Sequence, residues 1–349
     1  MSGKRQHILP QFLVKGFSSR SAHSNHFVWV YRKGQAPFES NIINVGVEKN
    51  FYSEDDSTID EKITDAERGY AELLNELRRI KKSELINKEM LPYFIAHLEI
   101  RTRNVRESLI EISDLFLNEI IKFFQKQENV NRFITKYADN AMNQVDNAIN
   151  RELKKISIPK AKQAYVNLMI KEKKRLVQSN LGPLFLLFIN HLPGLFKKNP
   201  DIVKRTHLKA FQDSVSPKLR VQEHQKLIWN LIYFDKEYFI LGDFGVLFEI
   251  ESSKKYATFW EKDQKVISAF LPISKNHLVI GSKSEINNIP NINWLNQEIA
   301  KYSREYFLSA INNPFQLNLA NYIGNKSQWL TEREIMEISN ELLKNDLYN

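Results

Sequence analysis

Two charged residues, Arg101 and Glu67, fall where the sequence pattern predicts buried helix faces. Arg101 follows Leu98 by three residues and precedes Val105 by four, which puts it on an apolar helical stripe. Glu67 follows Ile63 by four residues, on or beside the inner face of the preceding helix. Because an unpaired buried charge is very costly, we expect these residues to pair across an antiparallel helix hairpin. The pair either sets the packing of the two helices or lines a functional pocket where shifted protonation is useful.

Asp243 and His7 are the other polar residues that could take part in chemistry. Asp243 stands in FILGDFGVLF, at the expected end of an apolar strand, where Gly242 and Gly245 permit a tight turn. Its carboxylate either caps that turn through the backbone or is exposed in a cleft. His7 precedes the apolar residues of QHILPQFLVKGF, where it is either a core histidine or a general base.

The elements that must position these residues form three zones. Residues 26–52 are strand-like, residues 59 to about 230 have helical spacing, and residues 237–282 return to strand patterns. Two helices are expected to close the chain. The individual helices predicted are 87–127, 130–155, 159–178, 201–212, 219–233, 291–311 and 331–344.

This order predicts an α+β fold, in which a small mixed or antiparallel sheet is built from strands near both chain ends. We expect one domain over residues 1–349, with sheet-forming strands in 1–58 and 234–283. A large helical insert would occupy 59–233, and C-terminal helices 284–349.

Composition narrows the class of protein. The chain has 349 residues, 42% hydrophobic, and no cysteine, so disulfides and thiolate metal sites are excluded and a reducing compartment is favoured. The uncharged window 176–196 is interrupted by Gly and Pro, which favours a buried core segment over a membrane span. We therefore expect a cytoplasmic protein without a membrane partner. P-loop, dinucleotide, G-x-S-x-G and H-E-x-x-H signatures are missing.

Positive charge is concentrated in residues 151–226. Residues 151–178 contain nine Lys or Arg against two acids, and residues 197–226 eight against three. The segment therefore carries a formal charge of +12, against +9 for the whole chain. It is either a solvated helical surface or a surface for a polyanion such as nucleic acid, with contacts from Lys171, Lys173, Lys174 and Arg175.

Several short phrases resemble the domain-of-unknown-function family 4238, a group of uncharacterised, mostly bacterial proteins. They run collinearly from about residue 4 to 310: RQHILPQFLVKGF, VWVYRK, NFYSEDDSTIDEKITDAE, HLEIRTRNVRE, ILGDFGVLF and FLPISKNHLVI. The chain departs from the family phrase around Asp243, where Asn and Pro are missing but the carboxylate remains. The resemblance implies that His7, Glu67, Arg101 and Asp243 recur together, from segments as distant as those of many functional sites.

Three functional hypotheses follow. In the first, the protein is a nucleic-acid hydrolase, such as a nuclease or toxin in phage defence. His7 would be the general base, Glu67 and Asp243 would hold Mg²⁺, and Arg101 would stabilise the phosphorane. In the second, a non-catalytic protein binds nucleic acid or another partner. In the third, the same pocket holds a small molecule or nucleotide as a sensor. The second hypothesis makes the four residues structural, whereas the first and third place them at a site. We predict that the four side chains converge on one pocket.

Overall fold

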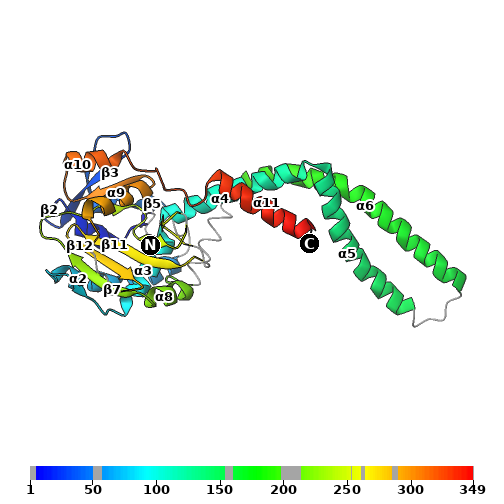
Figure 1. Ribbon diagram of the computed structural model, residues 1–349, viewed down its shortest axis with the longest axis horizontal. Helices are drawn as coiled ribbons and strands as arrows, with labels where there is room; N and C mark the ends of the chain where they lie inside the picture. The colour runs from blue at the N-terminus through cyan, green and yellow to red at the C-terminus, as the bar shows by residue number, and fades with distance from the viewer. Residues whose placement is uncertain are drawn as a thin grey trace. The chain divides into compact units, whose positions relative to one another are not determined.

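The computed structural model describes residues 5–49, 57–153, 160–197, 214–252, 254–260, 264–284 and 290–348. The chain forms two compact units (Figure 1), the first made of Met1–Leu109 with Val203–Trp329 and the second of Ile110–Ile202 with Leu330–Asn349. Helices and antiparallel sheets are mixed, which confirms the α+β class. Where the sequence suggested one domain, part of the helical insert belongs to a unit of its own with the C-terminal helix.

The described residues of the first unit form three antiparallel sheets. A two-stranded sheet joins β1 (Arg5–His7) to β5 (Val47–Lys49). A five-stranded sheet has the order β2-β3-β13-β8, with β4 paired to β3; its strands are β2 Arg20–Ala22, β3 Asn25–Arg32, β4 Phe38–Asn41, β8 Leu241–Gly242 and β13 Tyr306–Ser309. A six-stranded sheet has the order β10-β9-β11-β12-β7-β6; its strands are β10 Tyr256–Ala257, β9 Leu247–Ile250, β11 Val266–Ser274, β12 His277–Ser282, β7 Ile228–Tyr233 and β6 Glu84–Leu85.

The two strand-rich zones of the sequence therefore share a sheet, but only in part. Strand β3 from the N-terminal zone and β8 from the C-terminal zone both lie in the five-stranded sheet, where β13 stands between them. Most strands of residues 237–282 instead lie in the six-stranded sheet, where β12 pairs with β7 and β11 pairs with β12 and β9. Their near-continuous apolar sequence fits this position, because β11 and β12 are buried along almost their whole length.

Helices complete the first unit around a core of buried apolar side chains. They are α1 Gln11–Val14, η1 Lys15–Phe17, η2 Ile42–Asn44, α2 Ser57–Arg79, α3 Met90–Arg101, α8 Lys218–Gln225, α9 Ile292–Tyr302 and α10 Pro314–Ala320. The second unit contains most of α4 (Arg103–Phe124) together with α5 (Gln127–Leu153), α6 (Lys160–Lys197) and α11 (Glu332–Tyr348). Its small core is aromatic: Phe185 lies 4.7 Å from Phe133 and 4.9 Å from Phe124, measured between ring centroids. Among the described residues, no helix combines the length and apolar character that crossing a membrane requires.

Several predicted helix boundaries were wrong. The helix expected over 87–127 is divided at Thr102, whose backbone is extended and whose hydroxyl caps α4 by accepting from the N–H of Val105. The helix expected over 219–233 ends at Gln225, because the β-branched and aromatic run that follows pairs with β12. The helix expected over 291–311 ends at Tyr302, and β13 follows.

Two other predicted helices differ from the structure or fall outside it. The helix expected over 159–178 continues to Lys197, through Pro183 and Pro193. The helix expected over 201–212 lies outside the described residues.

The side chain of Arg78, at the end of α2, joins three parts of the first unit. Its guanidinium donates to the carbonyl oxygens of Phe12 (2.9 Å) and Leu13 (3.1 Å) in α1, and to that of Ile273 in β11 (2.9 Å). Burial lowers the pKa of Arg78 to about 10. A Cβ at Gly16 would lie 2.3 Å from the Ile273 oxygen and 2.6 Å from Nη2 of Arg78, so only glycine permits this approach.

Replacing Arg78 by Gln should lower the free energy of unfolding by about 2–4 kcal/mol, because buried carbonyl groups lose their donor. Arg79, the exposed neighbour in α2, offers a matched control whose change to Gln should cost no more than about 0.5 kcal/mol. Chemical denaturation of both variants measures the difference. Equal stabilities for the two variants would show that the Arg78 contacts do not hold α1.

Candidate functional site

Arg101 is the centre of a buried polar cluster. Its guanidinium donates to the Glu67 carboxylate, to the backbone carbonyl of His7 and to Nε2 of His97 (3.0 Å). The side chain of Arg101 is 3% exposed and that of Glu67 23% exposed, so the pair is shielded from water mainly on the arginine side. The ion pair expected between α2 and α3 is therefore present, and it also binds the N-terminal strand β1.

His97 is fully buried beside this pair and has a defined tautomer. Its Nδ1 lies 2.9 Å from the carbonyl oxygen of Val215, and its Nε2 faces the Arg101 guanidinium. Because the carbonyl only accepts and the guanidinium only donates, the proton is on Nδ1 and Nε2 accepts. Burial lowers the pKa of His97 to about 4, against the opposing effect of the Val215 carbonyl. His97 is therefore neutral at physiological pH.

Asp243 follows β8 and binds the backbone at the start of β13. Its Oδ1 accepts from the N–H of Arg304 (3.0 Å), while its Oδ2 accepts from those of Glu305 (2.6 Å) and Tyr306 (3.2 Å). Burial raises the pKa of Asp243 to about 6, although these three hydrogen bonds oppose the rise. The carboxylate thus joins two chain segments that are about sixty residues apart, as a backbone cap does.

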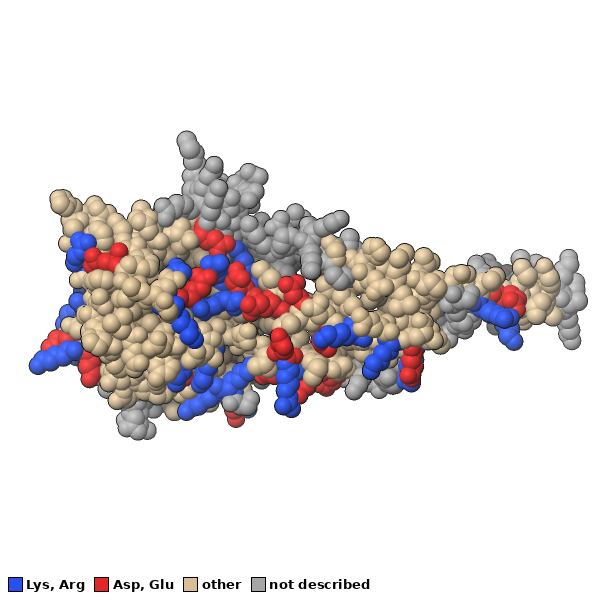
Figure 2. Space-filling model, turned by 90° about the horizontal axis from the view of Figure 1, so that it is seen from above, with Lys and Arg blue, Asp and Glu red and all other residues tan. Residues whose placement is uncertain are grey.

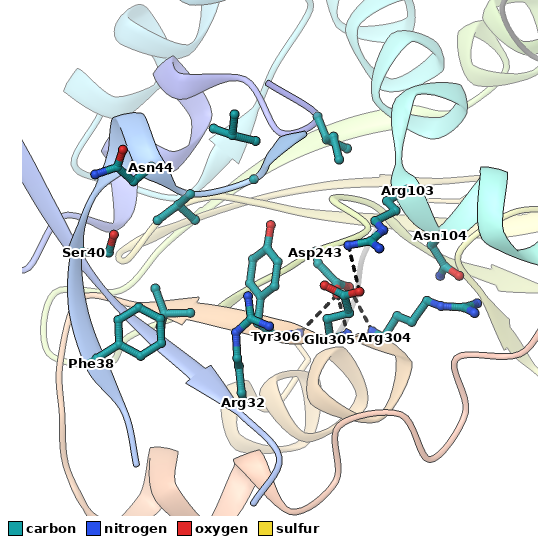
Figure 3. Close-up of a pocket in the computed structure, with 15 residues that line it drawn as sticks. Arg32, Phe38, Ser40, Asn44, Arg103, Asn104, Asp243, Arg304, Glu305 and Tyr306 are labelled. Carbon is teal, nitrogen blue, oxygen red and sulfur yellow. Dashed lines mark hydrogen bonds and ion pairs between the residues drawn. The ribbon is translucent and has the colours of Figure 1, made fainter. Parts of the chain in front are cut away.

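A pocket of about 140 Å³ lies beside Asp243 in the first unit (Figure 3). Figure 3 draws the Tyr306 ring between the side chains of β4 on one side and Arg103 with Asp243 on the other. The labelled polar and aromatic residues of its lining are Arg32, Phe38, Ser40, Asn44, Arg103, Asn104, Asp243, Arg304, Glu305 and Tyr306. Ile8 and Gly46 form part of the apolar wall, where the N–H of Ile8 donates to the Gly46 carbonyl (2.7 Å).

The charges around the pocket are only partly compensated. Arg103 forms an ion pair with Glu305 (2.9 Å), and the three N–H groups face the charge of Asp243. The Arg32 guanidinium lies 5.6 Å from the centroid of the Tyr306 ring and makes no ion pair with the part of the chain that the structure describes. The Tyr306 hydroxyl likewise has no hydrogen-bond partner among those residues. Burial, followed by the negative charges of Asp243 and Glu305, raises the pKa of Tyr306.

Comparison with known proteins identifies the family. The family model described as "Protein of unknown function (DUF4238)" matches residues 5–305. The chain belongs to this family. The match includes β1, the Arg101 cluster and Asp243, and it ends within the Arg304–Tyr306 segment. No curated protein matches the chain, and no solved structure matches it.

The family resemblance drawn from the sequence is therefore confirmed, and the four residues selected with it can be placed. Glu67 and Arg101 touch directly, and His7 joins them through its carbonyl oxygen while Nε2 of its ring lies 2.7 Å from Nε2 of Gln11. Asp243 lies on the pocket instead. The pocket and the cluster are neighbours along the chain, because Ile8 and Arg103 line the pocket one and two residues after His7 and Arg101.

A metal site at Glu67 and Asp243 has no further ligands in the described ranges. Within them, no group of three or more His, Cys, Asp or Glu residues is arranged to hold a metal ion. Glu67 is already bound by Arg101, and both oxygens of Asp243 accept from backbone N–H groups. This donor set does not resemble an open Mg²⁺ site, which keeps carboxylate oxygens free for the ion.

The basic residues proposed for nucleic acid lie in α6, within the second unit. Lys171 and Arg175 are exposed, and Arg175 is 3.9 Å from Glu172; the side chains of Lys173 and Lys174 are outside the described set. Figure 2 shows basic and acidic side chains next to one another on the face of the molecule that it draws. Nucleic-acid binding by this segment stays a prediction.

Sequence reasoning missed the pocket residues Arg32 and Tyr306. The search followed charged residues on apolar helix faces, whereas these two end β3 and begin β13. Their strands pair so that Tyr306 lies opposite Arg32 in the register. The only sequence signal was the polar and charged residue at the end of each strand, in VYRKG and SREYF.

The buried neutral His97 should contribute a loss of unfolding free energy as pH drops from about 6.5 to about 4. The pKa of His97 is lower in the folded chain than its ordinary value of 6.5, so the unfolded chain binds the extra proton in this window. The two pKa values set an upper limit of about 3 kcal/mol for this loss.

The wild type is compared with His97→Gln, because Asp243 changes the unfolding free energy in the opposite direction over the same pH range. Its raised pKa makes the folded chain the better proton acceptor between about pH 4 and 6. The difference between wild type and His97→Gln cancels that contribution. Denaturation curves at several pH values should show a smaller acid loss for the variant, and equal slopes would contradict the buried neutral histidine.

Proposed function

We propose that this protein binds a small phosphate-bearing molecule in the pocket between Arg32 and Tyr306, as a ligand-binding or sensing protein without turnover. The observation that supports it best is the cationic lining. Arg32, Arg103 and Arg304 line one pocket from three separate segments of the chain, with the Arg304 side chain directed away from Tyr306 (Figure 3). Guanidinium groups bind phosphate with two parallel hydrogen bonds, which gives both affinity and orientation.

The balance of charge favours an anion over a cation. Glu305 compensates Arg103, and backbone N–H groups compensate Asp243. The charge of Arg32 has no such partner in the described ranges. A phosphate at Arg32 would also lie near the Tyr306 hydroxyl, a donor that makes no hydrogen bond to those residues.

The size of the site supports a small ligand. A volume of about 140 Å³ is small beside the roughly 300–1,000 Å³ of typical ligand pockets. An open cleft of about 480 Å³ shares Arg32, Arg304 and Glu305 with the pocket and adds Lys33 to its lining. A nucleoside monophosphate would use both spaces, with its phosphate in the pocket and its sugar or base in the cleft.

The proposal predicts that AMP, or another nucleoside monophosphate, binds the wild-type protein in calorimetry. Arg32→Gln should weaken binding about 10- to 100-fold, because it removes a charge-assisted contact. Arg79→Gln, which alters an exposed arginine outside both cavities, should bind as the wild type does. If neither nucleotides nor inorganic phosphate bind, or if both variants bind equally, the proposal fails.

Hydrolysis of nucleic acid is a second candidate, and one observation favours it. Asp243 lines the pocket beside the arginines with a pKa raised by burial to about 6, close to the value suited to a general base. In this alternative Arg101 and Glu67 hold the wall of the site, and any Mg²⁺ would have to come with the substrate.

The hydrolase alternative predicts that the protein cleaves RNA or DNA with Mg²⁺, with a rate that rises through about pH 6. Asp243→Asn should then abolish cleavage. It should also lower the unfolding free energy by about 1–3 kcal/mol, since the amide keeps one acceptor oxygen and turns an NH₂ group toward backbone N–H donors. Cleavage is therefore measured far below the melting temperature of the variant. A wild type that cuts neither polymer, or a variant that cuts equally well, excludes the alternative.

A further inference from the structure

The longest helix of the second unit has an apolar stripe that faces solvent. Tyr165, Met169, Leu176 and Leu187 in α6 are each between 53% and 63% exposed. They follow one another by four, seven and eleven residues. At about 100° per residue these steps put all four within roughly 40° of one line along the helix. Leu168 and Leu184, 59% and 61% exposed, lie roughly 60° to either side of this line.

The core of the unit lies on the other side of α6. Phe185 and Ile189 belong to the core cluster there with residues of α4 and α5, including Phe124 and Phe133. The residues of the stripe therefore do not belong to the core of this unit. Glu172, seven residues after Tyr165, shares this line between Met169 and Leu176. Exposed apolar side chains gathered on one helix face still mark an interaction surface.

We propose that the stripe binds the same stripe of a second copy of this chain, with the two α6 helices antiparallel about a two-fold axis at Leu176. The stripe is self-complementary about that residue. Tyr165 lies eleven residues before Leu176 and Leu187 eleven after, so each Tyr165 would meet Leu187 of the second copy. Met169 would meet the segment that contains Leu184.

Charge selects the antiparallel arrangement. Residues 160–175 contain six Lys or Arg and one acid, whereas residues 176–196 contain no charged residue. Antiparallel helices put each basic half beside the uncharged half of the other copy. Parallel helices would put the two basic halves together, where they repel.

The length and chemistry of the stripe also fit a helix pair. From Tyr165 to Leu187 the helix extends about 33 Å, or roughly three heptads, at the 8–10 Å spacing of packed helices. Three of the four stripe side chains are aliphatic or thioether groups. Base stacking on nucleic acid uses aromatic rings instead, so a protein helix is the better match.

Single cysteines test the arrangement directly, because the chain has none of its own. Under mild oxidation, Leu176→Cys on the two-fold axis should form a disulfide-linked dimer. Tyr165→Cys and Leu187→Cys should each stay unlinked alone and become linked when the two variants are mixed. Leu219→Cys, at a 66% exposed position in α8 of the first unit, controls for random collision. Linking of Tyr165→Cys with itself would mean parallel helices and overturn the proposal.

Light scattering after size exclusion gives a second measurement. Wild type should have twice the mass of one chain, and Leu176→Glu should weaken dimerisation roughly 100-fold, since it places two unpaired charges on the axis. Leu219→Glu should remain dimeric. A wild type that is monomeric at micromolar concentration overturns the proposal. So does a stripe that binds vesicles of anionic phospholipid or a single-stranded oligonucleotide in place of a second copy.

Discussion

Two buried guanidinium groups hold the N-terminal segment of this protein against its core. Arg101 binds the carbonyl of His7, and Arg78 binds the carbonyls of Phe12 and Leu13. Both arginines come from helices that follow later in the chain, α2 and α3. The phrase RQHILPQFLVKGF is thus held through backbone oxygens, which any side chain could supply, and its own apolar side chains fill the core beneath it. A lysine could not replace either arginine fully, because one ammonium group cannot reach separate acceptors in the planar geometry of a guanidinium.

The pocket depends on this attachment. Ile8 follows the residue that Arg101 binds, and its N–H donates to Gly46, whose backbone has φ of +62°. A side chain at Gly46 would be strained and would crowd Leu9 and the Tyr306 hydroxyl, at 3.2 and 3.3 Å from its Cβ. The wall opposite is set by Asp243, which orients three successive N–H groups at the start of β13. The walls are therefore built by polar contacts to backbone, and the pocket lies between them.

Sequence patterns predicted the polar contacts whose absence would leave a buried charge unpaired at a high energetic cost. A charge on an apolar helical stripe must find a partner, so the Glu67–Arg101 pair could be predicted from spacing alone, as could the α+β class from the zones of periodicity. Other features depend on tertiary pairing that no local pattern encodes. Thr102 divides a continuous apolar stripe into two helices, β13 forms where helical spacing continues, and Tyr306 meets Arg32 only through strand register. The partners of Asp243 are backbone groups, which have no sequence signature at all.

The family pattern and the pocket lining therefore point to different roles for different residues. Glu67, Arg101 and His7 are engaged with one another, and Asp243 is engaged with backbone, so changing any of them alters the protein even when no ligand is present. The polar groups of Arg32 and Tyr306 have no partners in the described ranges, so these groups contribute little to the stability of the fold. A ligand, in contrast, would gain most from these two. Polar residues selected by a family resemblance can thus mark the frame of a site, while the groups that would bind a ligand belong to residues that the resemblance does not select.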